Sequence, residues 1–171
     1  MMSITPTEVG SFFLTLIVPI VTGVVAAGFT AYFALNRFYR EKWWEKKHAA
    51  YNQLIDKLFE LKDLYKHASD FYEMVHEADR GERSPPKGSV DWNHINQVNA
   101  QVHRFYVLSP ISFGDNASSL LDGFFEKHSN ISMSVHEEGY PDFVAYYELA
   151  NFLQELIDAI VNDAKSELKF N

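Results

Sequence analysis

The stretch from Ser11 to Leu35 reads SFFLTLIVPIVTGVVAAGFTAYFAL, which is 25 residues without one charged side chain. At about 1.5 Å of rise per residue, a helix of this length crosses a hydrocarbon core of roughly 30 Å. The alternative is a cleavable signal peptide, which begins with a basic segment and has a shorter apolar core. Residues 1–10 hold no Lys or Arg, and the basic residues follow the apolar stretch. The sequence therefore predicts a retained N-terminal transmembrane helix.

Basic residues come directly after this stretch, where residues 37–47 hold five Lys and Arg against two acidic residues. Positive charge next to a span favours the cytoplasmic side of a membrane. We therefore expect a single-pass protein of the bacterial inner membrane, with its N-terminus outside and its C-terminal domain in the cytoplasm. The absence of Cys fits a reducing compartment. The residues expected at the membrane interface are aromatic side chains for the headgroup layer and arginines that reach phosphates, namely Arg37, Phe38, Tyr39, Arg40, Trp43 and Trp44.

Small residues recur every four positions within the predicted span, at Gly23, Ala27 and Ala31. Small side chains at this spacing let two helices approach closely inside a bilayer, although small residues are common in membrane helices generally. With the heptad pattern described below, this row favours a homo-oligomer, for which a tetramer is one candidate.

The chain divides by composition into three parts: residues 1–36 with the tail and span, the basic and aromatic segment 37–47, and a domain over 48–171. The last part holds ten Lys and Arg against 20 Asp and Glu, a net charge of −10. Because long nucleic acids are bound largely through many phosphate contacts, this charge argues against DNA or RNA as partners.

An all-α fold is expected, with the span followed by a cytoplasmic bundle of about four helices. The apolar spacing and the turn residues predict helices over 37–80, 91–108, 115–127 and 141–168, the second stopped by Pro110. Asp115 or Asn116 is the expected cap of the third, short helix. The Ser-rich residues 129–139 are predicted to form a loop.

Two rows of apolar residues repeat every seven positions along the first of these helices, as in the seam of a bundle or coiled coil. The rows are Tyr51, Leu58, Tyr65 and Tyr72, and Leu54, Leu61, Ala68 and Val75. The expected inner stripe of the last helix is Phe143, Tyr147, Ala150, Leu153, Ile157, Ile160 and Ala164.

Catalytic motifs are lacking: the chain has no Cys, no Gly-x-Ser-x-Gly and no phosphate-binding Gly-rich loop. Glu73 and His76 have the Glu-x-x-His spacing of di-iron bundles, but such sites need a second copy, which the chain does not contain. A solvated acidic helix face explains the pair, and His136, Glu137 and Glu138 are expected in a loop. We expect no enzyme, no cofactor and no metal site.

The second helix of the domain carries an unusual polar face. Amide side chains offer both a donor and an acceptor, and Arg can hold a phosphate with two hydrogen bonds. An amide-rich solvated surface is the alternative explanation. The candidate ligand-binding residues are Arg104, His103, Gln101, Gln97 and His94 on this helix, with Lys127 and Lys87 elsewhere.

The segment EKWWEKKHAAY, residues 41–51, resembles small bacterial membrane proteins with one N-terminal span and a helical domain, some of them from antiphage loci. Among these, the chain is similar to membrane effectors of type III CRISPR systems that recognise cyclic tetra-adenylate. The resemblance covers residues 11–75 and supplies no motif in residues 90–171. It implies an antiviral effector that binds a cyclic oligoadenylate, whereas the acidic domain departs from what a nucleotide-binding domain would favour.

Two functions are therefore expected. The first is an oligomeric membrane effector whose helical domain binds a cyclic oligonucleotide and signals to the spans. The second is a scaffolding subunit that binds a partner protein through the heptad aromatics. A weaker third is a metal-dependent enzyme built around Glu73 and His76.

Overall fold

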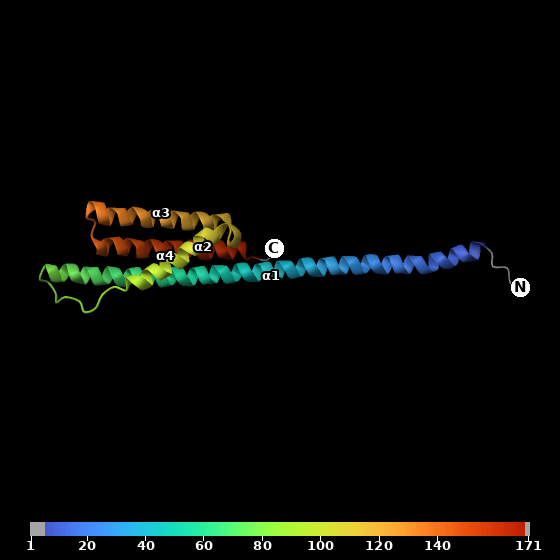
Figure 1. The fold of residues 1–171 in the computed structure, drawn as a ribbon, viewed down its shortest axis with the longest axis horizontal. Coiled ribbons are helices and arrows are strands. Elements are labelled where there is room, and N and C mark those ends of the chain that lie inside the picture. Colours follow the sequence, from blue (N-terminus) through green and yellow to red (C-terminus); the bar gives the residue numbers. More distant parts are fainter. Residues whose placement is uncertain (1–5, 170–171) are drawn as a thin grey trace. The chain divides into compact units, whose positions relative to one another are not determined.

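The chain is helical throughout the range that the structure describes. The computed structural model describes the backbone of residues 6–169, with side chains in this range other than those of 6–14, 16 and 18. The helices are α1 (Pro6–Asp79), α2 (Trp92–Ser112), α3 (Asp115–Glu138) and α4 (Asp142–Glu167), shown in Figure 1. No strand occurs within residues 6–169. The prediction of an all-α fold is confirmed.

Two compact units divide the chain, Met1–Trp44 and Glu45–Asn171. In the first, the part of α1 from Pro19 onward contains a window long and apolar enough to cross a membrane, and none of that window is buried. By length and composition this stretch is a candidate membrane span, and a signal sequence near the N-terminus has the same properties. The span itself, its orientation and its membrane remain predictions.

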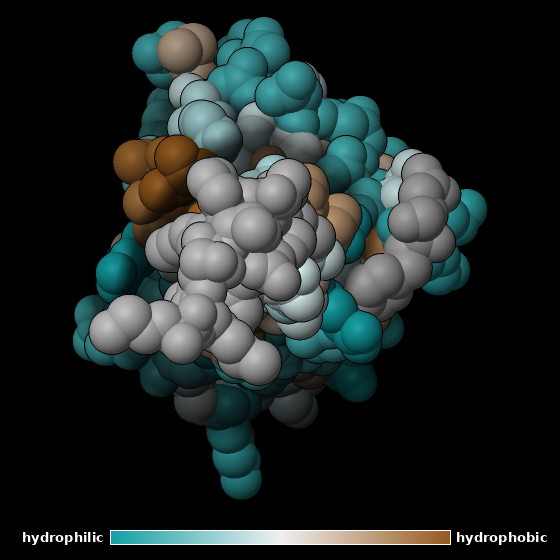
Figure 2. Space-filling model, turned by 90° about the vertical axis from the view of Figure 1, so that its right-hand side faces the viewer, coloured by the Kyte–Doolittle hydropathy of each residue, from teal (hydrophilic) through white to brown (hydrophobic). Residues whose placement is uncertain are grey.

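In the second unit the helices pack side by side (Figure 1). The α4 helix lies between α3 and the latter half of α1, where Ser69 Oγ donates a 2.7 Å hydrogen bond to the carbonyl oxygen of Phe143. The α2 helix runs obliquely beside α3, and Tyr106 Oη donates a 2.7 Å hydrogen bond to Asp122 Oδ1. For the chain as a whole, Figure 2 shows hydrophilic residues over much of the visible surface that is not grey, with hydrophobic residues gathered on one side of the view.

The heptad residues of α1 form the centre of the core. Six of the eight are buried, while Tyr72 and Val75 at the far end are half-buried. The buried members are Tyr51, Leu54, Leu58, Leu61, Tyr65 and Ala68. Since this seam packs against α2, α3 and α4 of the same chain, it is occupied within one copy. The prediction of a homo-oligomer therefore rests on the small residues of the predicted span alone.

The predicted ends of α2 and α3 need correction. The α2 helix does begin after Asp91, whose Oδ1 accepts a 3.0 Å hydrogen bond from the His94 amide. It does not stop at Pro110 but continues to Ser112. Pro110 has no backbone N–H, so it removes one hydrogen bond of the last turn. Directly after the helix, the Phe113 ring packs against the Tyr51 ring, with 4.9 Å between the ring centroids.

The third helix is longer than predicted, because residues 129–138 continue it instead of forming a loop. Ile131 is buried in the core, so the Ser-rich segment has one apolar face and one solvated face. The helix ends at Gly139, whose φ of 68° is the left-handed conformation that favours glycine. At its start the N-cap is Gly114, not the expected Asp115 or Asn116.

The predicted inner stripe of α4 is wrong in the first turns of the helix. Tyr147 is 60% exposed, whereas Ala145 and Leu149 are buried in its place. The stripe from Ala150 to Ala164 is buried as expected, at Ala150, Leu153, Ile157, Ile160 and Ala164.

Candidate ligand-binding site

A cleft between α1 and α2 brings together two of the predicted ligand-binding residues. Gln101 and Arg104 of α2 line it, with a volume of about 480 Å³. We call it the α1–α2 cleft, and its other lining residues are Gln53, Asp56 and Lys57 of α1 and Phe105 and Leu108 of α2. Its position follows from helical spacing, because Gln101, Arg104 and Leu108 recur at three- and four-residue steps on one side of α2.

Arg104 is the unpaired cation of this cleft. Within residues 6–169 no carboxylate forms an ion pair with its exposed guanidinium group. Lys57 is engaged, because its Nζ lies 2.7 Å from Glu60 Oε2. That hydrogen bond is the main reason that the pKa of Glu60 is lowered, so Glu60 stays ionised and holds Lys57. The lining residues Asp56, Lys57 and Arg104 carry a formal net charge of +1, and Glu60, which is paired with Lys57, brings the sum of these four residues to zero.

The groups around Arg104 suit a ligand that carries both phosphate and base. A guanidinium can hold a phosphate through two parallel hydrogen bonds, and the Gln53 and Gln101 amides can pair with the donors and acceptors of a base edge. Phe105 and Leu108 provide an apolar floor. A concave apolar surface with a few polar groups is the usual composition of a small-molecule site.

The other predicted α2 residues lie outside this cleft. His94 Nε2 is 3.1 Å from Glu60 Oε1, so it links α2 to α1 beside the cleft. The His103 ring packs edge-to-face against Phe125 of α3 at 5.2 Å between centroids. Gln97 is exposed on α2. These three residues do not converge with Gln101 and Arg104 on one ligand.

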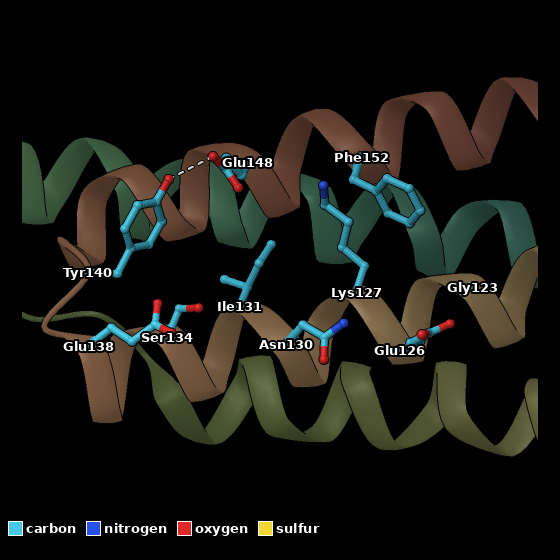
Figure 3. A pocket seen from close by; sticks show the side chains of 10 residues that line it. All are labelled: Gly123, Glu126, Lys127, Asn130, Ile131, Ser134, Glu138, Tyr140, Glu148 and Phe152. Carbon is cyan, nitrogen blue, oxygen red and sulfur yellow. Dashed lines mark hydrogen bonds between the residues drawn. The ribbon is translucent and has the colours of Figure 1, made fainter.

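The two lysines predicted as contacts also lie elsewhere. Lys87 is exposed in the segment between α1 and α2. Lys127 extends from α3 towards α4 in a groove of about 420 Å³ (Figure 3), with its Nζ 5.5 Å from the centre of the Phe152 ring. Three glutamates line the same groove, and one of them, Glu148, accepts a 2.7 Å hydrogen bond from Tyr140 Oη. This groove is net negative and does not favour an anion.

Glu73 and His76 of α1 do not gather further metal-ligating groups among the described residues. Among the described residues, no three His, Cys, Asp or Glu side chains lie close enough together to hold a metal ion. The His76 ring packs 5.2 Å from the Phe143 ring instead. His136, Glu137 and Glu138, expected in a loop, belong to the last turn of α3.

The expected interface residues belong to the helical backbone of α1. Arg37 forms an ion pair with Glu41, with 2.7 Å between Nε and Oε1. Phe38, Tyr39 and Trp43 are exposed, as side chains at a headgroup layer would be in a single chain. Their contact with lipid remains a prediction.

Sequence reasoning missed the α1 wall of the cleft. Gln53, Asp56, Lys57 and Glu60 occupy positions i, i+3, i+4 and i+7, so they share one face of the helix. This polar row can be seen in the sequence, but nothing in the sequence indicates that it faces α2.

No family model matches the chain, and no curated protein or solved structure is significantly similar to it. The resemblance to effectors of antiphage loci therefore remains a prediction from the sequence, and the function is argued from the residues alone.

Proposed function

We propose that the chain is a single-span membrane effector of bacterial antiviral defence whose helical domain binds a cyclic oligonucleotide, with cyclic tetra-adenylate as the first candidate. The observation that carries the proposal is the α1–α2 cleft, in which an unpaired Arg104 lies beside the amide of Gln101. Binding would be non-enzymatic, with Arg104 holding a phosphate and the amides of Gln53 and Gln101 holding a base.

Signalling would act through α1. The cleft residues Gln53 and Lys57 belong to the same helix as the apolar stretch, because α1 extends over Pro6–Asp79. A ligand that binds more tightly to one arrangement of α1 than to another shifts the balance towards the first. In a homo-oligomer, copies of Arg104 would surround one symmetric ligand, and cyclic tetra-adenylate offers one phosphate to each of four copies.

Calorimetry of the full chain in lipid nanodiscs with cyclic tetra-adenylate tests the proposal. We expect micromolar binding and a loss of at least about tenfold for Arg104→Ala, because a hydrogen bond to a charged group contributes roughly 1.5–3 kcal/mol. Lys66→Ala is the matched control, since it removes an exposed cation of α1 that does not line the cleft. Absence of heat at 100-fold higher concentrations (about 100 μM), or unchanged affinity in Arg104→Ala, would contradict the proposal.

A scaffolding role is the second candidate, although not through the heptad aromatics, because Tyr51 and Tyr65 are buried in the core. The end of α2 supports it instead, since Val107 is 61% and Ile111 79% exposed. Ile111→Asp should then abolish capture of a partner protein, whereas Arg104→Ala should leave that capture intact. The opposite pattern would favour the ligand-binding role.

A further inference from the structure

A second cavity lies on the face of α2 opposite the α1–α2 cleft. Each of the four helices contributes at least one aromatic or polar side chain to its lining. Its volume is about 320 Å³, at the lower end of the roughly 300–1,000 Å³ typical of small-molecule sites. We call it the aromatic cavity and define it by the residues used below: Tyr65 of α1, Trp92 and Asn99 of α2, His128 of α3 and Tyr146 of α4.

Three aromatic rings form adjoining walls. The Tyr146 ring lies 5.2 Å from the Trp92 ring and 6.0 Å from the Tyr65 ring, centroid to centroid, and it is nearly parallel to the latter. Aromatic walls of this kind favour flat ring systems, because stacking on a π-face is largely independent of the substituents of the ring.

One polar atom at this cavity lacks a partner. The Oδ1 atom of Asn99 is buried, and within the described part of the chain it accepts no hydrogen bond. Buried acceptors are almost always satisfied, by protein, by water or by a ligand. Asn99 also lines the cavity, so a rotation of its amide would present this acceptor to a donor that enters the cavity.

The cavity lining carries no fixed charge, because none of its described residues is Lys, Arg, Asp or Glu. Two histidines line it, His128 and, in the last turn of α3, His136. His128 Nε2 lies 2.8 Å from Tyr65 Oη, and burial lowers the pKa of His128, so its imidazole is uncharged at neutral pH. Burial also raises the pKa of Tyr146 to about 12, which keeps its phenol protonated. A cationic ligand would therefore lose its hydration without gaining an ionic partner among these residues.

We infer that the aromatic cavity binds a neutral, planar nitrogen heterocycle of nucleobase type, with its ring against Trp92 and Tyr146 and a ring or exocyclic N–H donated to Asn99 Oδ1. This site is distinct from the proposed phosphate site, because Gln101 and Arg104 line the α1–α2 cleft and not this cavity. It does not depend on the proposed function.

Saturation-transfer NMR of the full chain in nanodiscs tests the site, with adenine as the probe and benzene as an apolar comparison. We expect adenine to bind with a dissociation constant below about 1 mM and benzene to bind at least about tenfold more weakly. No transfer to adenine at millimolar concentration would overturn the inference. Equal binding of benzene would also overturn it, because the cavity would then be only an apolar void.

Asn99→Leu gives the sharper test. It should weaken adenine binding at least about tenfold and raise the thermal midpoint, since it removes an unsatisfied acceptor. Asn93→Leu, at an exposed position of the same helix, should change neither. Tyr146→Leu, which removes one wall, should also weaken adenine binding.

Unchanged adenine affinity in both Asn99→Leu and Tyr146→Leu would overturn the inference. Arg104→Ala should leave adenine binding unchanged, and this separates a failure of the aromatic cavity from a failure of the proposed cyclic-oligonucleotide site.

Discussion

The Tyr51 hydroxyl donates a 2.6 Å hydrogen bond to Oδ2 of Asp163, and both side chains are buried. Asn116 Nδ2 donates a 2.9 Å hydrogen bond to the other carboxylate oxygen of Asp163. Lys47, one turn before Tyr51 in α1, forms an ion pair with Glu167, one turn after Asp163 in α4. These contacts tie the beginning of the helical domain in α1 to the end of α4 and the start of α3.

Tyr51→Phe should destabilise the domain by about 1.5–3 kcal/mol, because it removes a hydrogen bond to a buried carboxylate. Burial, and next the bond to Asp163, raises the pKa of Tyr51, so the phenol remains a donor at neutral pH. Thermal unfolding of the full chain, followed by circular dichroism, measures the effect. Tyr147→Phe, at a 60% exposed position, serves as the control. Equal midpoints for the two variants would show that the buried bond contributes nothing.

Leu61→Ala should cost about 2–5 kcal/mol, since Leu61 is fully buried in the heptad seam and its truncation leaves a cavity. Phe59→Ala, two residues earlier on an exposed face, should cost much less. Comparison of the two unfolding midpoints tests whether the seam forms the core of the domain. If both substitutions were equally mild, the seam would not be the core of the domain.

Acid should weaken the fold in part through His128. Burial lowers the pKa of this imidazole in the folded state, so the unfolded chain binds more protons as the pH falls. The stability from the neutral imidazole is therefore complete above the unfolded pKa of about 6.5 and decreases below it. His128→Gln, which keeps a partner for Tyr65, should lose less stability than the native chain between pH 7 and pH 5.

Unfolding of both proteins at each pH, with His67→Gln at an exposed position as the control, checks this difference. Parallel pH profiles for the native chain and His128→Gln would rule out His128 as the acid-sensitive group.

Gly23→Leu should reduce self-association of the span. A large side chain in the row of Gly23, Ala27 and Ala31 would keep two helices from close approach in the bilayer. Chemical cross-linking in native membranes measures the oligomer fraction, and Val24→Leu, which adds volume outside the row, is the matched control. An oligomer fraction that is equally insensitive to both substitutions would remove the small residues as the packing surface.

Much of the fold could be predicted from the sequence, because regular apolar spacing identifies a helix and its buried face even when the segments that pack against it are unknown. The heptads of α1 and the start of α2 near Asp91 are examples of this local signal. The prediction was wrong where local composition and tertiary packing disagree. Residues 129–138 are rich in polar residues, yet the segment is helical, with Ile131 buried and Val135 packed against the core.

The candidate sites were harder to predict because their residues come from different helices. The polar face of α2 identified Gln101 and Arg104, but not which surface of α1 would oppose them. The aromatic cavity combines Tyr65, Trp92 and Tyr146, which are separated by more than 20 residues at each step and share no sequence motif. Only the packing of the helices brings such side chains together.

Thiol accessibility tests the central claim, a chain anchored in the inner membrane with its domain inside the cell. The chain contains no Cys, so Ser3→Cys and Ser84→Cys each introduce a single reporter, one before the apolar stretch and one in the exposed segment between α1 and α2. In spheroplasts treated with a membrane-impermeant maleimide, we expect the thiol at position 3 to react at once. The thiol at position 84 should react only after the membrane is permeabilised. Labelling of position 84 in intact spheroplasts, or recovery of the unprocessed chain in the soluble fraction, would contradict the account.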